Sequence, residues 1–427
     1  MNILLTGATG FIGSHLLRAL LAQGHHVTAC VRDPQRAAMQ FSGPRYVRCD
    51  YTSDHDTACW GERLTGIEVV INTVGIIREH GTQTFHALHY AAPRALFQAA
   101  AAAGVRQVIQ ISALGADAEA TSAYHLSKRA ADDALEDLAL DSIVLRPSIV
   151  HGAGAKSSEF FRAIAALPLI PLPDDGAQQV QPIHISDLTT IVLDCLARPR
   201  HGHHRLDVVG AERITMRNLL LQLRSWLGLG RPRLLRIPYA LLLPLARIGG
   251  FLGTAPLGTE TIAMLCRGNC APLEPLTDVI GFVPRGYTAS LSSVPATQAE
   301  RWHAHLYFIR PLLRMSLAFL WIGTAVTSAL LFPVVDSYAM LALTGITGVA
   351  APVALYGAAT LDLILGLALL LRHRLRSAFW LQLIVIAVYT LIITVALPEY
   401  WLHPFGPITK NVPLLVTLFS WYAMEKS

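Results

Sequence analysis

The chain has 427 residues, of which 53% are hydrophobic and only 15% are charged, with a formal net charge of +5 at pH 7. This composition excludes a disordered chain, because such chains are poor in apolar residues. No stretch combines clustered basic residues with interleaved aromatic ones, so we expect no nucleic-acid partner. From Met315 onward, charged residues occur only in short places between long apolar runs, which indicates a soluble N-terminal part and a membrane C-terminal part.

In the N-terminal part, short apolar runs alternate with helical stretches. Strands are predicted at 3–6, 26–31, 46–48, 68–72, 107–112 and 142–145, and helices at 11–23, 85–103 and 124–138. This alternation predicts an α/β fold with a doubly wound parallel sheet, in which ligands bind at the carboxyl ends of the strands. Residues 147–293 are less regular and are predicted to form a smaller lobe that closes over the sheet.

The first predicted strand runs directly into a glycine-rich turn. Its residues are Thr6, Gly7, Ala8, Thr9, Gly10, Phe11, Ile12 and Gly13. The first glycine is expected to turn tightly, the second to let backbone N–H groups approach a pyrophosphate, and the third to let the helix pack on the strand. A plain structural turn is the alternative, but the position between a strand and a helix favours nucleotide binding.

The residues after the second and third predicted strands bear on which nucleotide is bound. Arg32 comes first after the second strand and favours the 2′-phosphate of NADP, whereas Asp33 offers a carboxylate to the ribose hydroxyls of NAD. We expect NADP, with NAD as the alternative. Asp50, after the third strand, is placed to reach an adenine edge or, alternatively, to cap a turn.

A serine, a tyrosine and a lysine follow the fifth predicted strand. Ser112 ends that strand, and Tyr124 and Lys128 lie one turn apart on one face of the next helix. An ammonium near a phenol favours the phenolate, so we expect the pKa of Tyr124 to lie below its usual value of about 10, as acid–base catalysis requires. Ser112 is expected to polarise the reacting carbonyl. A surface tyrosine and a solvated lysine are the alternative, but the chain has only four lysines, which favours catalysis.

Residues 1–295 resemble the short-chain dehydrogenase/reductase superfamily, in its extended or atypical branch. The resemblance rests on the glycine turn, on the serine, tyrosine and lysine above, and on Arg32, Asn72-Thr73-Val74-Gly75, Arg146-Pro147-Ser148-Ile149-Val150 and Pro182-Ile183-His184-Ile185-Ser186-Asp187. It implies a Rossmann domain that binds NAD(P), with Thr73, Gly75 and Lys128 in the cofactor site. The residues from Pro256-Leu257 to Gly281-Phe282-Val283-Pro284 are most similar to the branch that includes the nucleotide-binding accessory subunit of respiratory complex I. Members of that branch often bind the nucleotide without known turnover.

Two further segments of the N-terminal part carry weaker patterns. His201, His203 and His204 have no carboxylate or cysteine at ligand spacing and are predicted to form a solvated basic loop, so we expect no metal site. Residues 234–252 are apolar with two arginines and are predicted to pack within the small lobe, with an interfacial helix as the alternative.

Four apolar stretches follow in the C-terminal part. Residues 315–335 carry no charge and are long enough to cross about 30 Å of hydrocarbon. A second span is expected over 349–371, preceded by a short helix or re-entrant piece, and a third over 377–398. Residues 411–424 form the shortest of the four predicted spans. The aromatic residues of 398–407 are typical of a membrane interface.

The tail, residues 310–425, resembles the DoxX-like family of four-helix membrane domains. Its matching segments are Arg310-Pro311-Leu312-Leu313-Arg314, Pro398-Glu399-Tyr400-Trp401 and Pro404-Phe405-Gly406-Pro407, followed by Lys410-Asn411. The resemblance implies a membrane location, and relatives linked to quinol-dependent oxidation imply a quinone-like small molecule as a candidate ligand. Asp362 lies inside the second span, where an acid indicates function by default; a buried hydrogen bond between helices is the alternative.

These features predict a nucleotide-binding domain over 1–295, a linker over 296–309 and an all-α four-helix transmembrane domain over 310–427. The expected function is a membrane-anchored NADP-dependent oxidoreductase of a hydrophobic substrate. The alternative is a non-catalytic nucleotide-binding protein that stabilises or assembles a membrane complex of the respiratory type. A soluble sugar-nucleotide epimerase comes third, because the membrane tail counts against it. With no signal peptide expected, the distribution of basic residues predicts four crossings of a bacterial-type inner membrane, with both termini cytoplasmic.

Overall fold

The computed structural model describes residues 1–242, 244 and 267–425. The chain divides into two compact units, Met1–Ala304 and His305–Ser427. Residues 245–252 of the apolar stretch after Leu234, the Pro256-Leu257 pair and Lys426 lie outside the described residues.

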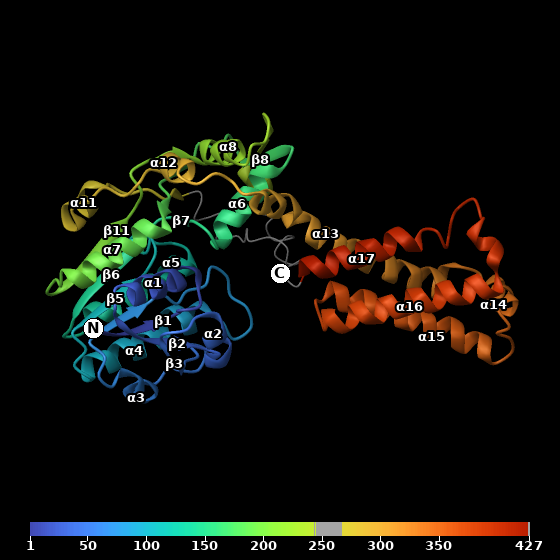
Figure 1. The fold of residues 1–427 in the computed structure, drawn as a ribbon, viewed down its shortest axis with the longest axis horizontal. Coiled ribbons are helices and arrows are strands. Elements are labelled where there is room, and N and C mark those ends of the chain that lie inside the picture. The colour runs from blue at the N-terminus through green and yellow to red at the C-terminus, as the bar shows by residue number, and fades with distance from the viewer. Residues whose placement is uncertain (243, 245–266, 426–427) are drawn as a thin grey trace. The chain divides into compact units, whose positions relative to one another are not determined.

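The first unit is built on one seven-stranded sheet, in the order β11-β6-β5-β4-β1-β2-β3 (Figure 1). The strands are β1 (Asn2–Thr6), β2 (His26–Val31), β3 (Arg45–Arg48), β4 (Val69–Asn72), β5 (Gln107–Ile111), β6 (Asp141–Pro147) and β11 (His203–Val208). Every neighbouring pair is parallel, so the predicted doubly wound parallel sheet is confirmed. The strand order reverses at β1, whose neighbours are β2 and β4, and ligands bind at the carboxyl ends of strands at such a point.

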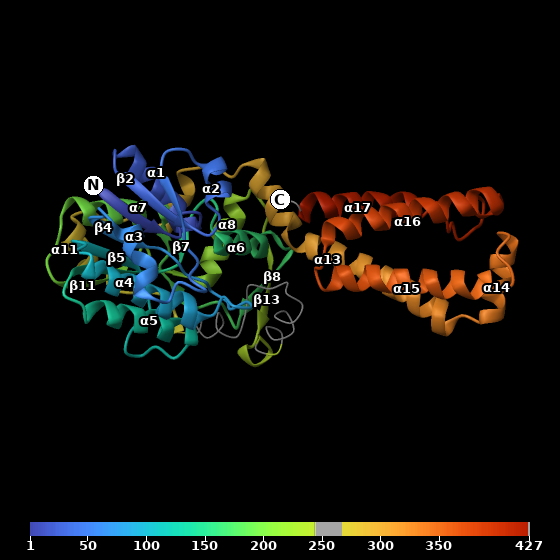
Figure 2. The same cartoon turned by 90° about the horizontal axis from the view of Figure 1, so that it is seen from below.

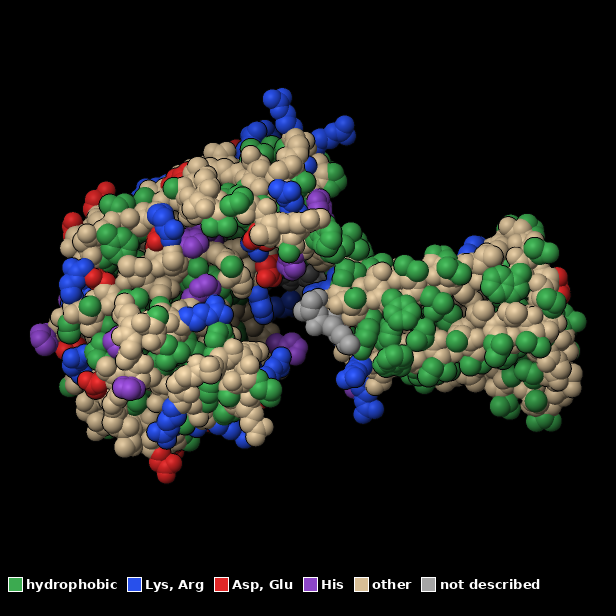
Figure 3. All heavy atoms as spheres, in the orientation of Figure 1, with side chains coloured by type: hydrophobic (Ala, Val, Ile, Leu, Met, Phe, Trp, Pro, Cys, Tyr) green, Lys and Arg blue, Asp and Glu red, His purple; other side chains and the backbone are tan. Residues whose placement is uncertain are grey.

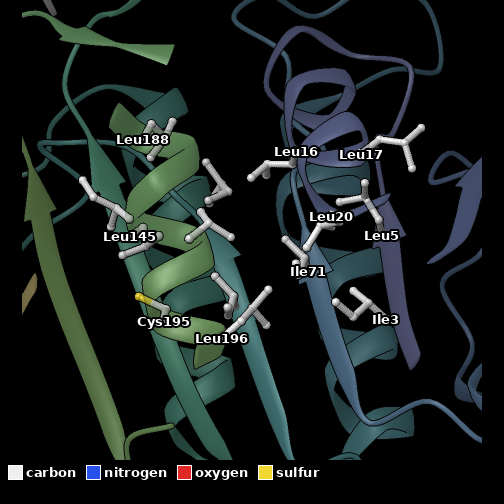
Figure 4. Packing of buried hydrophobic residues seen from close by; sticks show 14 of the residues in the cluster. Ile3, Leu5, Leu16, Leu17, Leu20, Ile71, Leu145, Leu188, Cys195 and Leu196 are labelled. Atoms are coloured by element: carbon white, nitrogen blue, oxygen red, sulfur yellow. The ribbon is translucent and has the colours of Figure 1, made fainter. Parts of the chain in front are cut away.

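Helices cover both faces of this sheet (Figure 2). Those of the first face are α1 (Phe11–Ala22), α2 (Pro34–Gln40), α7 (Ile185–Ala197) and α11 (Glu274–Ile280), and those of the second are η1 (Thr57–Trp60), α3 (Gly61–Leu64), η2 (His86–Ala91), α4 (Ala92–Ala102) and α5 (Ala123–Glu136). Successive strand side chains point to opposite faces. Ile3 and Leu5 therefore belong to one core with Leu20 of α1 (Figure 4), whereas Leu4 joins the second core with Trp60.

The seventh strand was not predicted from the sequence. β11 pairs with β6 from His203 opposite Ser142 to Val208 opposite Pro147. The prediction of a solvated loop is therefore wrong for His203 and His204, because their strand occupies the edge of the sheet, where polar side chains reach water while Leu206 and Val208 are buried. Among the described residues, no group of three or more His, Cys, Asp or Glu side chains is arranged to hold a metal ion.

The small lobe is made of short elements. They are β7 (Val150–His151), α6 (Lys156–Ala166), β8 (Leu169–Pro173), β9 (Gln179–Val180), β10 (Ile183–His184), β12 (Ile214–Thr215), α8 (Met216–Trp226), β13 (Arg233–Ile237) and α12 (Tyr287–Ser292). β7 pairs with β10, β9 with β12 and β8 with β13. The guanidinium of Arg285 donates to Asp187 Oδ1 at 2.8 Å, and its backbone N–H donates to Oδ2 at 2.9 Å. This ion pair joins the segment 182–187 to the residue that directly follows the segment 281–284.

The second unit is all helical. Its elements are α13 (Gln298–Val326), which begins before the unit boundary, η3 (Thr327–Leu331), α14 (Val334–Leu343), α15 (Ala350–Leu370), α16 (Leu375–Ala396), η4 (Pro398–Trp401) and α17 (Asn411–Glu425). Among the residues that the structure describes, three helical stretches are long and apolar enough to cross a membrane: Gln298–Leu331, Ala350–Leu370 and Leu375–Ala396. α14 lies where a short helix is expected before the second span. On the face shown in Figure 3, apolar side chains cover much of this unit. Most of the segment 296–309, expected to be a linker, is helical.

A few polar contacts and one close approach pin the helices of this unit together. Trp321 Nε1 donates to Gln382 Oε1 at 2.8 Å, which links α13 to α16. A Cβ added to Gly366 would lie 2.5 Å from Ile322, so α13 and α15 approach closely there, as small residues permit in membranes. Asp362 is 3% exposed, and its Oδ1 has no hydrogen-bond partner among the described residues.

Candidate functional site

The glycine turn lies at the carboxyl end of β1 and leads into α1. Gly7 has a φ of +72°, which favours glycine, and its carbonyl accepts the N–H of Gly10 at 2.8 Å. A Cβ on Gly13 would lie 2.1 Å from the same carbonyl oxygen, so the helix packs against the turn as closely as the sequence predicted. Helix α1 begins at Phe11 without a side-chain cap in the described chain and without an acid in its first turn. Its N-terminal N–H groups and the helix dipole therefore suit a pyrophosphate.

The segment after β4 lies between this turn and α5. Thr73 Oγ1 donates to the carbonyl of Thr6 at 2.7 Å. A Cβ added to Gly7 would lie 2.6 Å from Thr73 Oγ1. At the other end of the segment, a Cβ on Gly75 would lie 3.0 Å from Lys128 Nζ. The structure therefore brings together these five residues, all of which the sequence assigned to the cofactor site.

Lys128 is almost fully buried and anchors α5 to the sheet. Its Nζ donates to the carbonyls of Val74 and Ile111, both at 3.2 Å. Burial lowers the pKa of Lys128 to about 8, while the nearby Asp132 carboxylate acts in the opposite direction. The ammonium is thus placed at the carboxyl ends of β4 and β5, next to the loop that borders the glycine turn.

The residues expected to select the nucleotide lie after β2 and β3. Arg32 is exposed, whereas Asp33 Oδ1 accepts the backbone N–H of Arg36 at 3.0 Å and so caps α2. Asp50 Oδ1 accepts the N–H of Thr52 at 3.0 Å and its hydroxyl at 2.8 Å, which is the turn-capping arrangement given above as the alternative. Burial raises the pKa of Asp50, but these bonds and the charge of Arg32 outweigh it, so the pKa lies below its usual value.

The hydroxyl of Ser112 is bound to a residue that the sequence analysis missed. Ser112 Oγ donates to Asp132 Oδ2 at 2.5 Å, and Asp132 is fully buried. Burial raises the pKa of Asp132 to about 7, against the opposing effects of the Ser112 bond and the Lys128 charge. Tyr124, Lys128 and Asp132 are spaced four residues apart on α5, so helical periodicity is a signal from which this carboxyl could have been found, although it was not used.

Tyr124 lies at the start of α5, half-buried among aromatic rings. Its ring stands edge-on to Phe85 at 6.0 Å and to His89 at 5.4 Å, measured between ring centroids. The expected lowering of its pKa is wrong: burial and the Asp132 carboxylate raise the pKa of Tyr124 to about 12. The Lys128 ammonium is directed at backbone carbonyls instead. The phenol therefore keeps its proton at neutral pH, which suits a proton donor.

A buried histidine links the loop after β4 to the start of α5. His89 Nε2 accepts the N–H of Ile76 at 2.9 Å, which places the ring proton on Nδ1, and Nδ1 lies 2.9 Å from Ser127 Oγ. Ser127 in turn donates to the carbonyl of Tyr124 at 2.8 Å. Burial and the Lys128 charge lower the pKa of His89 to about 2, so the ring is neutral. No spacing or motif in the sequence distinguished this histidine from the apolar residues around it.

A cavity of about 300 Å³ is lined by residues from the loop after β5, from α5, β9 and β11, and from the segment 267–272. Its walls include Leu114, two residues after Ser112, and His125, which follows Tyr124. Polar side chains are frequent among its other lining residues, which include Asp117, Gln179, Asp207, Arg267 and Asn269. The cavity therefore offers hydrogen-bond partners to a ligand, and Ser112, Tyr124 and Lys128 are not among its lining residues.

Two protein families match the two parts of this chain. Residues 7–162 match the NAD(P)H-binding family and residues 318–419 match the DoxX-like family. Ceramide reductase of Caulobacter vibrioides is 30% identical over 239 residues, which cover 55% of this chain and 73% of the relative. Subunit 9 of the mitochondrial NADH dehydrogenase [ubiquinone] 1 alpha subcomplex of Arabidopsis thaliana is 26% identical over 201 residues, which cover 44% of this chain and 48% of the relative.

A solved structure shows the same fold in the first unit. MoeE5, in complex with UDP-glucuronic acid and NAD, superposes with a TM-score of 0.52 at 24% identity, covering 68% of this chain and 97% of its own. The predicted resemblances to the dehydrogenase/reductase superfamily and to the DoxX-like family are thus confirmed. The chain belongs to the NAD(P)H-binding, short-chain dehydrogenase/reductase-like family and carries a C-terminal DoxX-like membrane domain.

Proposed function

We propose that the protein is a membrane-anchored, NADPH-dependent reductase of a lipid carbonyl, with Ser112, Tyr124 and Lys128 as its reacting set. The observation that carries this proposal is the position of Lys128 Nζ. It is bound to the carbonyls of Val74 and Ile111, at the strand ends that also border the glycine turn. A reacting set next to a nucleotide site is the arrangement that hydride transfer requires.

Each side chain of the set has a distinct task in this reaction. A nucleotide held by the glycine turn, Thr73 and Lys128 would supply the hydride that the carbonyl carbon receives. Tyr124 keeps its proton until the substrate oxygen becomes negative, and then donates it. Ser112 donates a hydrogen bond to the same oxygen and stabilises the developing charge. Lys128, fixed by two carbonyls, holds a positive charge close to both the loop and the helix.

The proposed substrate class is supported by one relative, by the polar lining of the cavity and by the apolar helices of the second unit. Ceramide reductase is a relative of this chain. A ceramide that carries a ketone in place of one of its hydroxyl groups is a carbonyl substrate, and its reduction yields a ceramide. The polar side chains that line the cavity suit the amide and hydroxyl groups of such a head group. The apolar helices of the second unit keep the protein in the bilayer where a lipid of this kind resides.

We also propose that NADPH is preferred over NADH and that Asp50 borders the adenine. The support is that Arg32 is exposed and Asp33 is occupied as the cap of α2. A guanidinium matches the geometry of a phosphate in a bidentate manner. Asp33 is then less available to ribose hydroxyls.

The membrane topology is a further part of the proposal. We place the protein in a bacterial-type inner membrane with four crossings and both termini cytoplasmic, because the basic residues follow the positive-inside rule. α17 is the critical element. It has 15 residues, or about 22 Å of helix, so residues before Asn411 must help it to cross. The domain limits 1–295, 296–309 and 310–427 stay part of the same proposal.

The experiment uses the full-length protein in lipid nanodiscs. NADPH oxidation is followed with a keto-ceramide, with the corresponding ceramide and with a short-chain ketone. We expect turnover of the keto-ceramide only, and a kcat at least about 100-fold lower in Tyr124→Phe, with NADPH affinity nearly unchanged. Tyr90→Phe is the matched control, since it removes a phenol from η2, outside the reacting set. Equal rates of Tyr124→Phe and wild type would remove Tyr124 from the mechanism.

A second function is favoured by one specific observation. The similarity to the complex I subunit supports a non-catalytic nucleotide-binding protein that stabilises or assembles a membrane complex. That function requires NADPH binding without turnover of any lipid or quinone-like carbonyl, together with loss of a membrane complex in a deletion strain. Native gel electrophoresis of solubilised membranes from that strain distinguishes the two.

A further inference from the structure

The hydroxyl of Ser112 has a single proton, and in the structure it forms a hydrogen bond to Asp132. Ser112 Oγ donates to Asp132 Oδ2 at 2.5 Å, and both side chains are buried. A serine hydroxyl donates one hydrogen bond and accepts two. While its proton is directed at Asp132, Ser112 is unable to donate to a substrate carbonyl.

The environment of Asp132 favours a second arrangement of the same two groups. Asp132 Oδ1 is buried and has no hydrogen-bond partner among the described residues. A buried oxygen without a partner is costly on an ionised carboxylate and much less so on a neutral acid. A protonated Asp132 donates to Ser112 Oγ across the same short distance, and the serine proton is then free to turn away from Asp132.

We propose that Asp132 is a positioning residue that sets the direction of the Ser112 hydroxyl: Ser112 donates to a substrate carbonyl only while the Asp132 carboxyl holds a proton. The inference rests on the proposed reductase function. The Asp132 proton is not consumed, since the proton that reaches the substrate oxygen comes from Tyr124. Ionised Asp132 instead makes Ser112 an acceptor, which suits an alcohol substrate and the reverse reaction.

The charges that face Asp132 come from three elements packed around it. On α5 itself these are Lys128 and the phenol of Tyr124, on β6 Arg146 and on β11 Arg205. The two arginines are already paired, Arg146 with Asp207 and Arg205 with Asp133 and Glu136. From η2 the neutral ring of His89 lies near Lys128. Lys128 is thus the remaining cation next to the carboxyl, and its titration has to be separated from that of Asp132.

The rate of keto-ceramide reduction as a function of pH tests the proposal. In wild type we expect kcat to fall about tenfold per pH unit on the alkaline side, as loss of one proton requires. Asp132→Asn presents an amide N–H to Ser112 at every pH, so its rate is expected to change less than about threefold over the same range. Asp137→Asn is the matched control, since it removes an exposed carboxylate at the end of the same helix and is expected to keep the wild-type profile. An alkaline fall that persists in Asp132→Asn, or moves to lower pH, assigns the titration to Lys128 and overturns the proposal.

A second measurement needs neither substrate nor turnover. Infrared spectra of the full-length protein are recorded during a pH titration across neutral pH. We expect a protonated-carboxyl band that disappears with rising pH in wild type and in Asp137→Asn, is absent in Asp132→Asn, and is shifted in Ser112→Ala. If this pattern is found while no lipid is turned over, the reductase function fails and the Ser112–Asp132 hydrogen bond stands. Identical spectra for wild type and Asp132→Asn would overturn the proposal even if the reductase function holds.

Discussion

The close contact between α1 and the glycine turn predicts that Gly13→Ala weakens nucleotide binding. A Cβ at this position would lie 2.1 Å from the carbonyl oxygen of Gly7, 2.7 Å from its carbonyl carbon and 2.8 Å from Thr73 Oγ1. Two of these three atoms belong to the backbone, so no side-chain rotation relieves the overlap. To restore ordinary contact distances, α1 has to move away from the turn by more than about 1 Å.

The size of the effect follows from this displacement. Inserting an atom into a closely packed site costs about 1–3 kcal/mol. Since the first N–H groups of α1 move with the helix, we expect the loss to fall on the site where the pyrophosphate binds. A loss of that size corresponds to an increase of about 5- to 150-fold in the Kd for NADPH.

The assay is fluorescence titration of the full-length protein in detergent with NADPH, together with thermal unfolding. Gly61→Ala is the matched control, because the backbone of Gly61 is helical, with φ −52° and ψ −55°, and nothing lies within 4 Å of an added Cβ. The control is expected to bind NADPH as wild type does and to gain up to about 1 kcal/mol of stability. Wild-type affinity in Gly13→Ala would refute the assignment of this turn to the nucleotide.

Three further predictions concern the nucleotide preference, the pH dependence of stability and the topology. Arg32→Ala is expected to weaken NADPH binding at least about tenfold and to leave NADH binding unchanged, whereas Arg36→Ala changes neither; equal affinity of wild type for both nucleotides contradicts the assignment. The pKa of His89 is lowered from 6.5 to about 2, so the contribution of the neutral ring to stability is fully present above pH 6.5 and is lost as the pH falls. We therefore expect the thermal unfolding midpoint to drop less steeply below pH 6.5 in His89→Gln than in wild type. A fluorescent protein fused to the C-terminus is expected to glow and an alkaline phosphatase fusion to be inactive, whereas an active phosphatase indicates three crossings.

Local patterns in the sequence were sufficient for most of the sheet. Six strands and the helices α1, α4 and α5 follow from apolar runs and from the 3.6-residue period, whereas the short helices α2, η1 and α3 were not predicted. The glycine turn follows from its place after the first strand. β11 was missed because a strand at the edge of a sheet carries polar residues, and His203-His204-Arg205 has no apolar alternation. The continuous helix from Gln298 was missed because its first residues are polar, and only the apolar run that begins at Met315 carries the pattern of a membrane span.

The spacing of residues along the sequence does not by itself predict the hydrogen-bond partners of buried polar side chains. The sequence motifs identified both Lys128 and Thr73-Val74-Gly75, but only the tertiary structure shows that they lie close together. The pKa of Tyr124 was predicted in the wrong direction, because its value depends on burial and on Asp132, neither of which a four-residue spacing reports. His89 gave no signal at all, since its role depends on the loop after β4.

The position of β11 at the edge of the sheet bears on the order of events during synthesis. The last strand of the sheet ends at Val208, and the first uncharged apolar stretch begins at Met315. At a translation rate of about 5–20 residues per second, the ribosome needs several seconds to pass from one to the other. All seven strands are therefore available for pairing before the membrane segment leaves the ribosome. We expect substitutions that delay pairing of β11 to lower the yield of inserted protein, because an unpaired sheet edge is exposed while the apolar helices emerge.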